Sequence, residues 1–182
     1  MIRAALLLLL SAGPAAAGCF AADGMPARAI YDGGSVLEYL GREGDVLTYR
    51  SGKVTSRVKD GIWPLENTGD GFRLEYFWTG DLPDLAAVKA AGGTARIEGE
   101  RQDAKGKRLA VAAEVEILGP EEVEWEDCIY KALRLRKTMF AAGRKEAEGV
   151  VVYAPDAMIV FRTEAVDQAS GKTFTYALEA LE

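Results

Sequence analysis

The stretch 29–61, AIYDGGSVLEYLGREGDVLTYRSGKVTSRVKDG, decides the fold. Short runs rich in Val, Leu, Tyr and Thr alternate in it with clusters of Gly, Asp and Ser at 32–34, 41–45 and 51–52. Gly and Asp readily adopt the positive-φ backbone conformations that tight hairpins need. The stretch therefore predicts four short antiparallel strands that follow one another directly, as in a meander.

The rest of the chain repeats this pattern with longer strands. In GFRLEYFWT (71–79), aromatic or aliphatic residues alternate with charged or polar ones, which is typical of a half-buried antiparallel strand. Further strands are expected at 94–103, 107–118, 123–140, 146–154, 157–166 and 172–180. The second of these is expected to end at Gly119-Pro120. The predicted fold class is mainly β, a strongly curved, half-barrel-like antiparallel meander.

One segment departs from the strand pattern. LPDLAAVKAAGG (82–93) is rich in alanine, begins with a Pro-Asp pair after Leu82 and ends with two glycines. This arrangement predicts one short helix near 83–91. A helix of this length is not stable alone, so we expect Leu85 and Val88 to pack against a sheet.

The composition argues against several classes of protein. The 182-residue chain has a formal net charge of −6, with 49% hydrophobic and 27% charged residues, and it contains no histidine. Histidine is the commonest general base and the commonest metal ligand, so Ser–His and Cys–His hydrolases do not fit. Nucleic-acid binding does not fit either, because it needs a basic surface. The short sequence motifs suggest no catalytic residue, metal ligand or cofactor.

The first seventeen residues predict export. MIRAALLLLLSAGPAAA (1–17) has one arginine, a short apolar run and then small residues, which is typical of a signal peptide cleaved after Ala17. The apolar run is too short for a permanent membrane span, and no later stretch is long enough. We therefore expect a periplasmic protein with a single β-rich domain at 18–182. The predicted helix divides this domain into a small N-terminal β lobe (25–80) and a larger sheet (94–182).

The two cysteines, Cys19 and Cys128, leave three forms open. Disulfides persist outside the cytoplasm, so Cys19 could tie the new N-terminus to the body of the protein. A lipid could instead be attached to Cys19, although Ala16 stands where lipoprotein signals usually have a large aliphatic residue. The third form has two free thiols. The even number of cysteines and their spacing favour the Cys19–Cys128 disulfide.

One stretch, YKALRLRKTMF (130–140), is basic. Strand alternation places Arg134 and Arg136 on one face. The other face carries Lys131, Leu133, Leu135 and Lys137. The stretch could bind an anionic partner, but pairing across strands with the acidic region 121–127, or with the glutamates at 98–100 and 114–116, is favoured.

Aromatic residues recur on the predicted strand faces, namely Tyr31, Tyr39, Tyr49, Phe72, Tyr76, Trp78, Phe174 and Tyr176. They could line the cavity of a curved sheet that holds an apolar ligand. Under this hypothesis Tyr76, Trp78 and Tyr176 are the candidate ligand-binding residues. Burial in the core is the commoner fate of alternating aromatic residues and is favoured.

Three stretches carry a resemblance to other proteins: YDGGSVLEY (31–39), EDCIYKALRLR (126–136) and YAPDAMIVFR (153–162). With the leader and the early cysteine, the chain resembles uncharacterised exported β-rich proteins of Gram-negative bacteria. In that group a Tyr-x-Pro-Asp/Glu stretch turns into one of the last strands, and Met158 replaces the glycine usual after the acidic residue. The broader group is similar to the half-barrels of periplasmic lipoprotein carriers. The resemblance implies fold, compartment and a Cys19–Cys128 pair, and it lends no activity.

These observations favour an exported, non-catalytic binding or structural module of the cell envelope. Its partner would be an apolar ligand or hydrophobic peptide on the concave face, or another envelope protein. An alternative is a lipid-anchored accessory lipoprotein, attached through Cys19, of an envelope assembly. A third hypothesis is a hydrolase that uses only carboxylates, which needs two facing carboxyl groups in a cleft.

Overall fold

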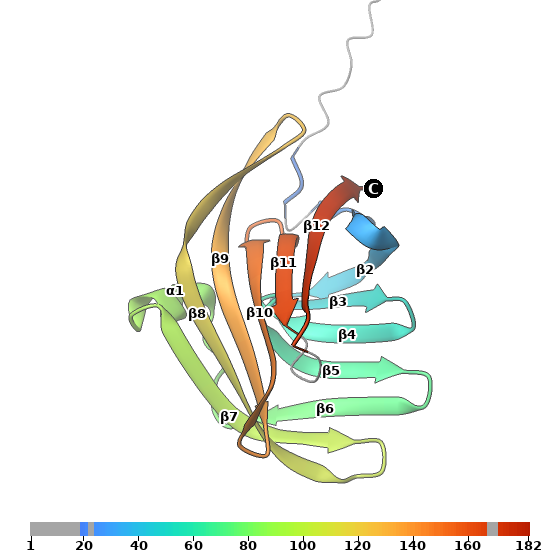
Figure 1. The fold of residues 1–182 in the computed structure, drawn as a ribbon, viewed down its shortest axis with the longest axis vertical. Helices are drawn as coiled ribbons and strands as arrows, with labels where there is room; N and C mark the ends of the chain where they lie inside the picture. The colour runs from blue at the N-terminus through green and yellow to red at the C-terminus, as the bar shows by residue number, and fades with distance from the viewer. Residues whose placement is uncertain (1–18, 22–23, 167–170) are drawn as a thin grey trace, which may run out of the picture.

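The computed structural model describes residues 19–21, 24–166 and 171–182. Within these residues, twelve antiparallel strands form a closed barrel (Figure 1). Strand β1 completes the ring by pairing with both β2 and β12. The predicted fold class, a mainly β antiparallel meander with one short helix, is confirmed. The predicted signal peptide at 1–17 lies outside the described residues. The division into lobes at 25–80 and 94–182 stays a prediction.

The elements follow the chain in simple order. The strands are β1 (Arg28–Tyr31), β2 (Ser35–Glu43), β3 (Val46–Ser51), β4 (Val54–Lys59), β5 (Trp63–Gly69), β6 (Phe72–Trp78), β7 (Thr94–Asp103), β8 (Arg108–Trp125), β9 (Cys128–Ala141), β10 (Arg144–Ala154), β11 (Ile159–Val166) and β12 (Thr173–Leu181). A 3-10 turn, η1 (Asp32–Gly34), joins β1 to β2, and α1 (Leu85–Ala90) joins β6 to β7.

The four strands predicted in 29–61 are present as β1 to β4. Their turns use glycines with positive φ, including Gly44 (φ 61°) and Gly52 (φ 56°), as tight hairpins require. The first turn is also held by the last strand, because the backbone N–H of Ala177 donates to Asp32 Oδ1 at 2.9 Å. This contact ties the two ends of the chain together where the ring closes.

The predicted bounds of two strands, 107–118 and 123–140, are wrong. The sequence predicts a strand end at Gly119-Pro120, but β8 continues through this pair to Trp125. A bulge between Ile117 and Gly119 shifts the register with β9, and a bulge accommodates a proline that has no N–H for the ladder. The turn lies instead at 126–127, where Glu126 adopts a φ of 51°. As a result, β8 and β9 form the long hairpin that rises above the barrel in Figure 1.

Buried side chains form two apolar clusters on opposite faces of β10. Val152 and Ala154 belong to the first cluster, whereas Tyr153 between them belongs to the second. The first cluster consists of Ala29, Tyr31, Cys128, Tyr130, Ala132, Val152, Ala154, Ala157, Ile159, Phe161 and Leu178. The second consists of Leu47, Val58, Ile62, Trp63, Val88, Ala113, Val115, Leu135, Tyr153 and Met158. Because side chains alternate between the two faces of a strand, both faces of β10 are buried. Removing the apolar surface of the two clusters from water is the main contribution to the stability of the fold.

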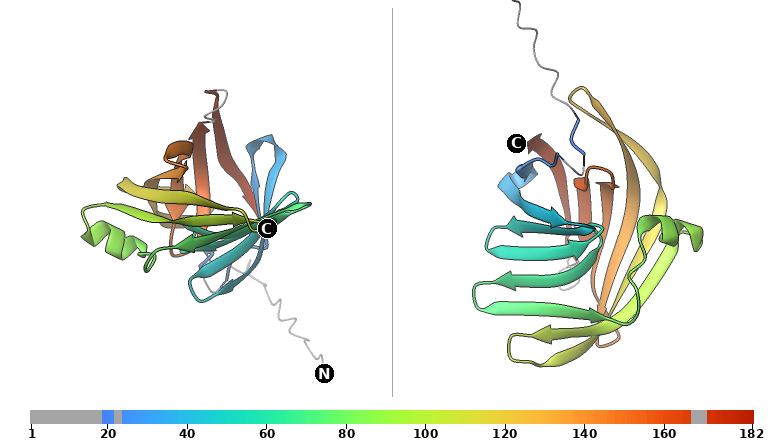
Figure 2. Two further views of the ribbon diagram at one scale, coloured as in Figure 1. Left: turned by 90° about the horizontal axis from the view of Figure 1, so that it is seen from below. Right: turned by 180° about the vertical axis from the view of Figure 1, so that it is seen from behind.

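The predicted helix packs on the barrel as expected. α1 lies against β7 and β8 on the outside of the ring (Figure 2). Asp84 caps its first turn, because Asp84 Oδ1 accepts a hydrogen bond from the N–H of Ala87 at 2.7 Å. Val88 is fully buried and Leu85 is partly buried against the second cluster. The packing of this apolar side supplies the stability that a six-residue helix lacks by itself.

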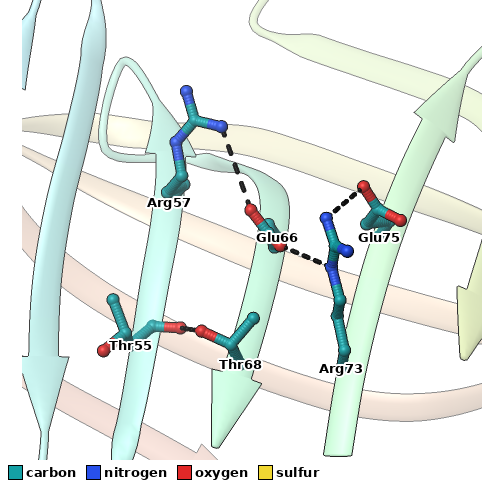
Figure 3. Close-up of polar contacts among 6 residues, drawn as sticks. All are labelled: Thr55, Arg57, Glu66, Thr68, Arg73 and Glu75. Atoms are coloured by element: carbon teal, nitrogen blue, oxygen red, sulfur yellow. Dashed lines mark hydrogen bonds and ion pairs between the residues drawn. The ribbon is translucent and has the colours of Figure 1, made fainter. Parts of the chain in front are cut away.

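Charged side chains pair across strands β4, β5 and β6 (Figure 3). Arg73 donates from Nε to Glu66 at 2.8 Å and from a terminal nitrogen to Glu75 at 2.8 Å. Arg57 lies 3.9 Å from the other oxygen of Glu66. Exposed pairs of this kind each contribute at most about 1 kcal/mol, so they favour the register of the strands more than they stabilise the fold.

The basic stretch 130–140 is paired in the way the sequence predicts. Arg134 lies 3.8 Å from Glu121, and Arg136 forms an ion pair with Glu116. Both arginines belong to β9 and both glutamates to β8, so these are cross-strand pairs within the long hairpin. The face of β9 that carries Arg134 and Arg136 is therefore neutralised by the chain itself.

Gly99 in β7 stands where no side chain fits. A Cβ atom there would lie 2.3 Å from the carbonyl oxygen of Phe77 and 2.9 Å from the Cα of Trp78, both in the β6 backbone. Because backbone atoms of a paired strand cannot move aside freely, Gly99→Ala is expected to lower the free energy of unfolding by about 1–3 kcal/mol. Urea denaturation measures this. Gly24→Ala, where the added methyl group meets open space, is the control, and an equal loss in both variants would contradict the prediction.

Candidate functional site

A cavity of about 270 Å³ lies between the first four strands and strands β9 to β12. It is lined by Tyr31, Ser35, Val36, Leu37, Tyr39, Leu47, Tyr49, Ser51, Val58, Gly61, Lys137, Val151, Tyr153, Met158, Val160, Thr163 and Tyr176. Ser35, Ser51 and Tyr176 are exposed and mark its mouth, whereas Leu47 and Val58 are buried. A mostly apolar lining with a few polar groups is characteristic of small-molecule sites.

Four tyrosines, Tyr31, Tyr39, Tyr49 and Tyr153, contribute hydroxyl groups to this lining. Tyr31 donates its hydroxyl to the carbonyl of Val160 at 2.8 Å, and Tyr153 donates to the carbonyl of Asp60 at 3.0 Å. Burial raises the pKa of Tyr31, Tyr39, Tyr49 and Tyr153 above the ordinary value for a phenol. The four phenols therefore remain neutral at physiological pH and can donate hydrogen bonds.

Lys137 is the cation of the cavity. It lies in β9 between Val115 of β8 and Gly149 of β10. It also lines a second cavity of about 160 Å³, which shares Tyr49 and Val58 with the first. Its Nζ contacts the carbonyl of Gly61 at 3.5 Å, at the limit of a hydrogen bond. Burial lowers the pKa of Lys137 to about 8, because the apolar surroundings disfavour the ammonium form.

Two backbone positions shape the cavity wall. Gly61 has a φ of 68°, and a Cβ atom there would lie 2.4 Å from the hydroxyl oxygen of Tyr153. Met158 adopts a φ of 55°, a conformation that favours glycine. The side chain of Met158 is buried in the cavity lining, so it fills space that a glycine would leave open.

The three aromatic residues proposed from the sequence are not brought together. Tyr176 lines the mouth of the cavity and is 38% exposed. Tyr76 and Trp78 stack on each other in β6, with ring centroids 5.7 Å apart, and neither is part of the cavity lining. Trp78 Nε1 donates to the carbonyl of Pro64 at 2.7 Å, a contact that supports the fold. A ligand-binding role for Tyr76 and Trp78 stays a hypothesis.

Sequence reasoning did not select Lys137, although the signal was present. The alternation in 130–140 places Lys137 on the same face as Leu133 and Leu135, which is the apolar face of the strand. A lysine on an apolar strand face indicates one of two things. Either the buried part of the strand ends there, or a functional cation lies inside the fold. Lys131, on the same face, is exposed, so the pattern alone could not tell the two lysines apart.

A disulfide joins Cys19 to Cys128, as the sequence favours. The S–S distance is 2.04 Å and the two Cα atoms are 5.6 Å apart. The backbone N–H of Phe20 also donates to the hydroxyl of Tyr130 at 3.1 Å, which holds the N-terminal segment on the first cluster. Both sulfurs are used in this bond, so the form with two free thiols is not the one observed.

Replacing Lys137 by methionine should change the pH dependence of stability. The folded pKa of about 8 lies below the ordinary 10.5, so between these values the unfolded chain binds more protons and stability increases with pH. Lys137→Met should remove about 1–2 kcal/mol of this increase between about pH 8 and pH 9.5. Urea denaturation of the wild type and the variant across this pH range measures the change. Because both proteins keep the same tyrosines, the difference between their pH dependences isolates the contribution of Lys137. The same pH dependence in both proteins would contradict the prediction.

The described part of the chain contains no group of three or more His, Cys, Asp or Glu side chains placed to hold a metal ion. None of the helices in residues 19–21, 24–166 and 171–182 has the length and apolar character to cross a membrane. The side chains that line the larger cavity supply hydroxyl groups and the ammonium of Lys137.

Comparison with known proteins gives the fold alone. No protein-family model matches the chain, and no curated protein sequence matches it significantly. Among solved structures, the chain is similar to the hypothetical lipoprotein YmcC from Escherichia coli K12, with 10% sequence identity and a TM-score of 0.52. The match covers 87% of this chain and 89% of YmcC. The two proteins thus share an architecture over nearly their whole length.

Proposed function

We propose that the protein is a non-catalytic binding module of the bacterial envelope that holds an apolar ligand inside the barrel. The observation that carries this proposal is the cavity of about 270 Å³, whose lining is dominated by aliphatic and tyrosine side chains and which has an exposed mouth. Sites that bind small apolar molecules combine such a lining with a few orienting polar groups.

Two further observations support a location in the bacterial envelope. Residues 1–17 have the pattern of a secretory signal, and the Cys19–Cys128 disulfide belongs to an oxidising environment. The similar fold of YmcC, which is described as a hypothetical lipoprotein, agrees with an envelope role.

The cavity gives no support to a carboxylate-only hydrolase. Such an enzyme needs two facing carboxyl groups in one cleft. The lining residues of this cavity include hydroxyl groups and one lysine but neither aspartate nor glutamate. A binding role therefore accounts for the lining better than hydrolysis does.

The second candidate is a lipid-anchored accessory lipoprotein attached through Cys19. The description of YmcC as a hypothetical lipoprotein favours it. Lipidation of Cys19 would, however, use the sulfur that bonds to Cys128. The intact mass of the exported protein separates the two candidates: a lipid-sized gain together with an alkylatable Cys128 would establish the anchor.

The binding proposal is tested by filling the cavity. Val151 lines the cavity from β10, so Val151→Phe should obstruct it and weaken binding of the neutral apolar probe N-phenyl-1-naphthylamine at least about tenfold. Its neighbour Val150 is on the opposite face of the strand, and Val150→Phe is the matched control. Fluorescence titration of the exported protein should give saturable binding at one site. The absence of saturable binding, or equal affinity in both variants, would refute the proposal.

A further inference from the structure

The inner face of β9 carries a cation at the junction of the two cavities. Lys137 lines both of them, and by strand alternation it shares its face with Leu135 and Met139. Leu135 is fully buried, so this is the face that packs into the second apolar cluster. An ammonium group is thus placed among aliphatic and aromatic side chains inside the barrel.

This ammonium has no acidic partner within the described part of the chain. The contact of its Nζ is the carbonyl of Gly61 at 3.5 Å. The basic residues on the opposite face of the same strand, Arg134 and Arg136, each pair with a glutamate. Glu114, which lines the second cavity, lies 3.6 Å from Arg96 instead. A chain that neutralises its outer arginines but leaves an inner lysine unpaired pays a desolvation cost that a bound anion would offset.

The neighbouring phenols suit an anionic head group. Tyr49 lines both cavities together with Lys137, and burial raises its pKa, so its hydroxyl stays protonated. A neutral phenol and an ammonium are both hydrogen-bond donors, and a carboxylate accepts from both. The lining of the larger cavity has no carboxylate that would repel such a ligand. Glu114, in the lining of the smaller cavity, is paired with Arg96.

The size of the cavities limits the apolar part of the ligand. Volumes of about 270 and 160 Å³ lie below the usual range of roughly 300–1,000 Å³ for drug-sized ligands, so a lipid with two long chains does not fit inside. One acyl chain of medium length is compatible with a space that is lined mainly by aliphatic and tyrosine side chains and opens at Ser35, Ser51 and Tyr176.

We propose that the ligand is a single-chain carboxylate, a fatty acid of medium length, whose head group binds the ammonium of Lys137 while its acyl chain fills the apolar cavity. This inference rests on the proposed function, because it specifies the ligand of the same cavity. It predicts that charge, and not only chain length, decides which amphiphile binds.

The test compares decanoate with 1-decanol, which has the same chain length and no charge. Isothermal titration of the exported protein at pH 7 should show that decanoate binds at least about tenfold more tightly than decanol. Lys137→Met should remove this preference, whereas Lys137→Arg should retain it. Lys131→Met is the matched control, because Lys131 belongs to the same strand but is exposed, and it should behave as the wild type.

The outcomes separate this inference from the function on which it rests. Equal binding of decanoate and decanol to the wild type would overturn the anionic ligand while leaving the apolar site in place. Binding of neither molecule, together with no binding of the neutral fluorescent probe, would refute the proposed function itself. A decanoate preference that survives Lys137→Met would also overturn the inference. The comparison in the wild type decides the question even if one variant fails to fold.

Discussion

Replacing Cys128 by serine is expected to lower the free energy of unfolding by about 3–5 kcal/mol. The disulfide closes a loop with a sequence separation of 109 residues, and a cross-link over so long a loop removes much conformational freedom from the unfolded chain. Cys128 is also 8% exposed and belongs to the first cluster, so a serine hydroxyl there would enter an apolar environment. Urea denaturation under non-reducing conditions measures the loss.

Cys19→Ser is the control for this prediction. Cys19 is exposed, so its replacement breaks the same bond without placing a polar group in the core. It should cause most of the loss seen for Cys128→Ser, and the double variant should be no less stable than Cys128→Ser alone. A loss below about 1 kcal/mol for Cys19→Ser, or losses that add in the double variant, would show that the disulfide does not stabilise the fold.

Trp63→Ala is expected to destabilise the protein by about 3–5 kcal/mol. Trp63 is fully buried in the second cluster at the start of β5. Its Nε1 donates to the carbonyl of Pro83 at 2.7 Å, just before α1 begins. The substitution therefore opens a large cavity and also releases the segment that leads into the helix, and thermal and urea denaturation both report the loss.

Two other variants separate packing from the hydrogen bond. Trp63→Phe keeps much of the buried volume but leaves the carbonyl of Pro83 without its donor, so about 1–3 kcal/mol should be lost. Phe77→Ala is the control for removal of an aromatic ring, because Phe77 in β6 is 45% exposed. It should cost less than about 1 kcal/mol. Equal losses for Trp63→Ala and Phe77→Ala would contradict the assignment of Trp63 to the core.

Local pattern predicted much of the fold because short turns join most of the successive strands. The Gly and Asp clusters in 29–61 identify β1 to β4, and the alanine-rich stretch with its Pro-Asp start identifies α1. The strand predicted at 94–103 coincides with β7. These features depend on turn chemistry and period-two alternation over a few residues, which a single sequence displays directly.

Long-range features could not be read in the same way. The closure of the ring depends on pairing between β1 and β12, at opposite ends of the chain, and no local pattern specifies that contact. The continuation of β8 through Gly119-Pro120 depends on a bulge that the partner strand accommodates. Lys137 could be placed on an apolar face from alternation, but its enclosure depends on Tyr49, Val58 and Gly61 from strands and turns distant in sequence.

The central claim is that an apolar ligand binds inside the barrel, and methionine methyl NMR tests it most directly. The sequence has four methionines, at positions 1, 25, 139 and 158. Met158 lines the larger cavity and Met139 the smaller one, whereas Met25 lines neither. Titration of the exported, methyl-labelled protein with decanoate should shift the Met158 resonance saturably, with a smaller effect at Met139 and little at Met25. An unchanged Met158 resonance at saturating ligand, or a shift confined to Met25, would contradict binding inside the barrel.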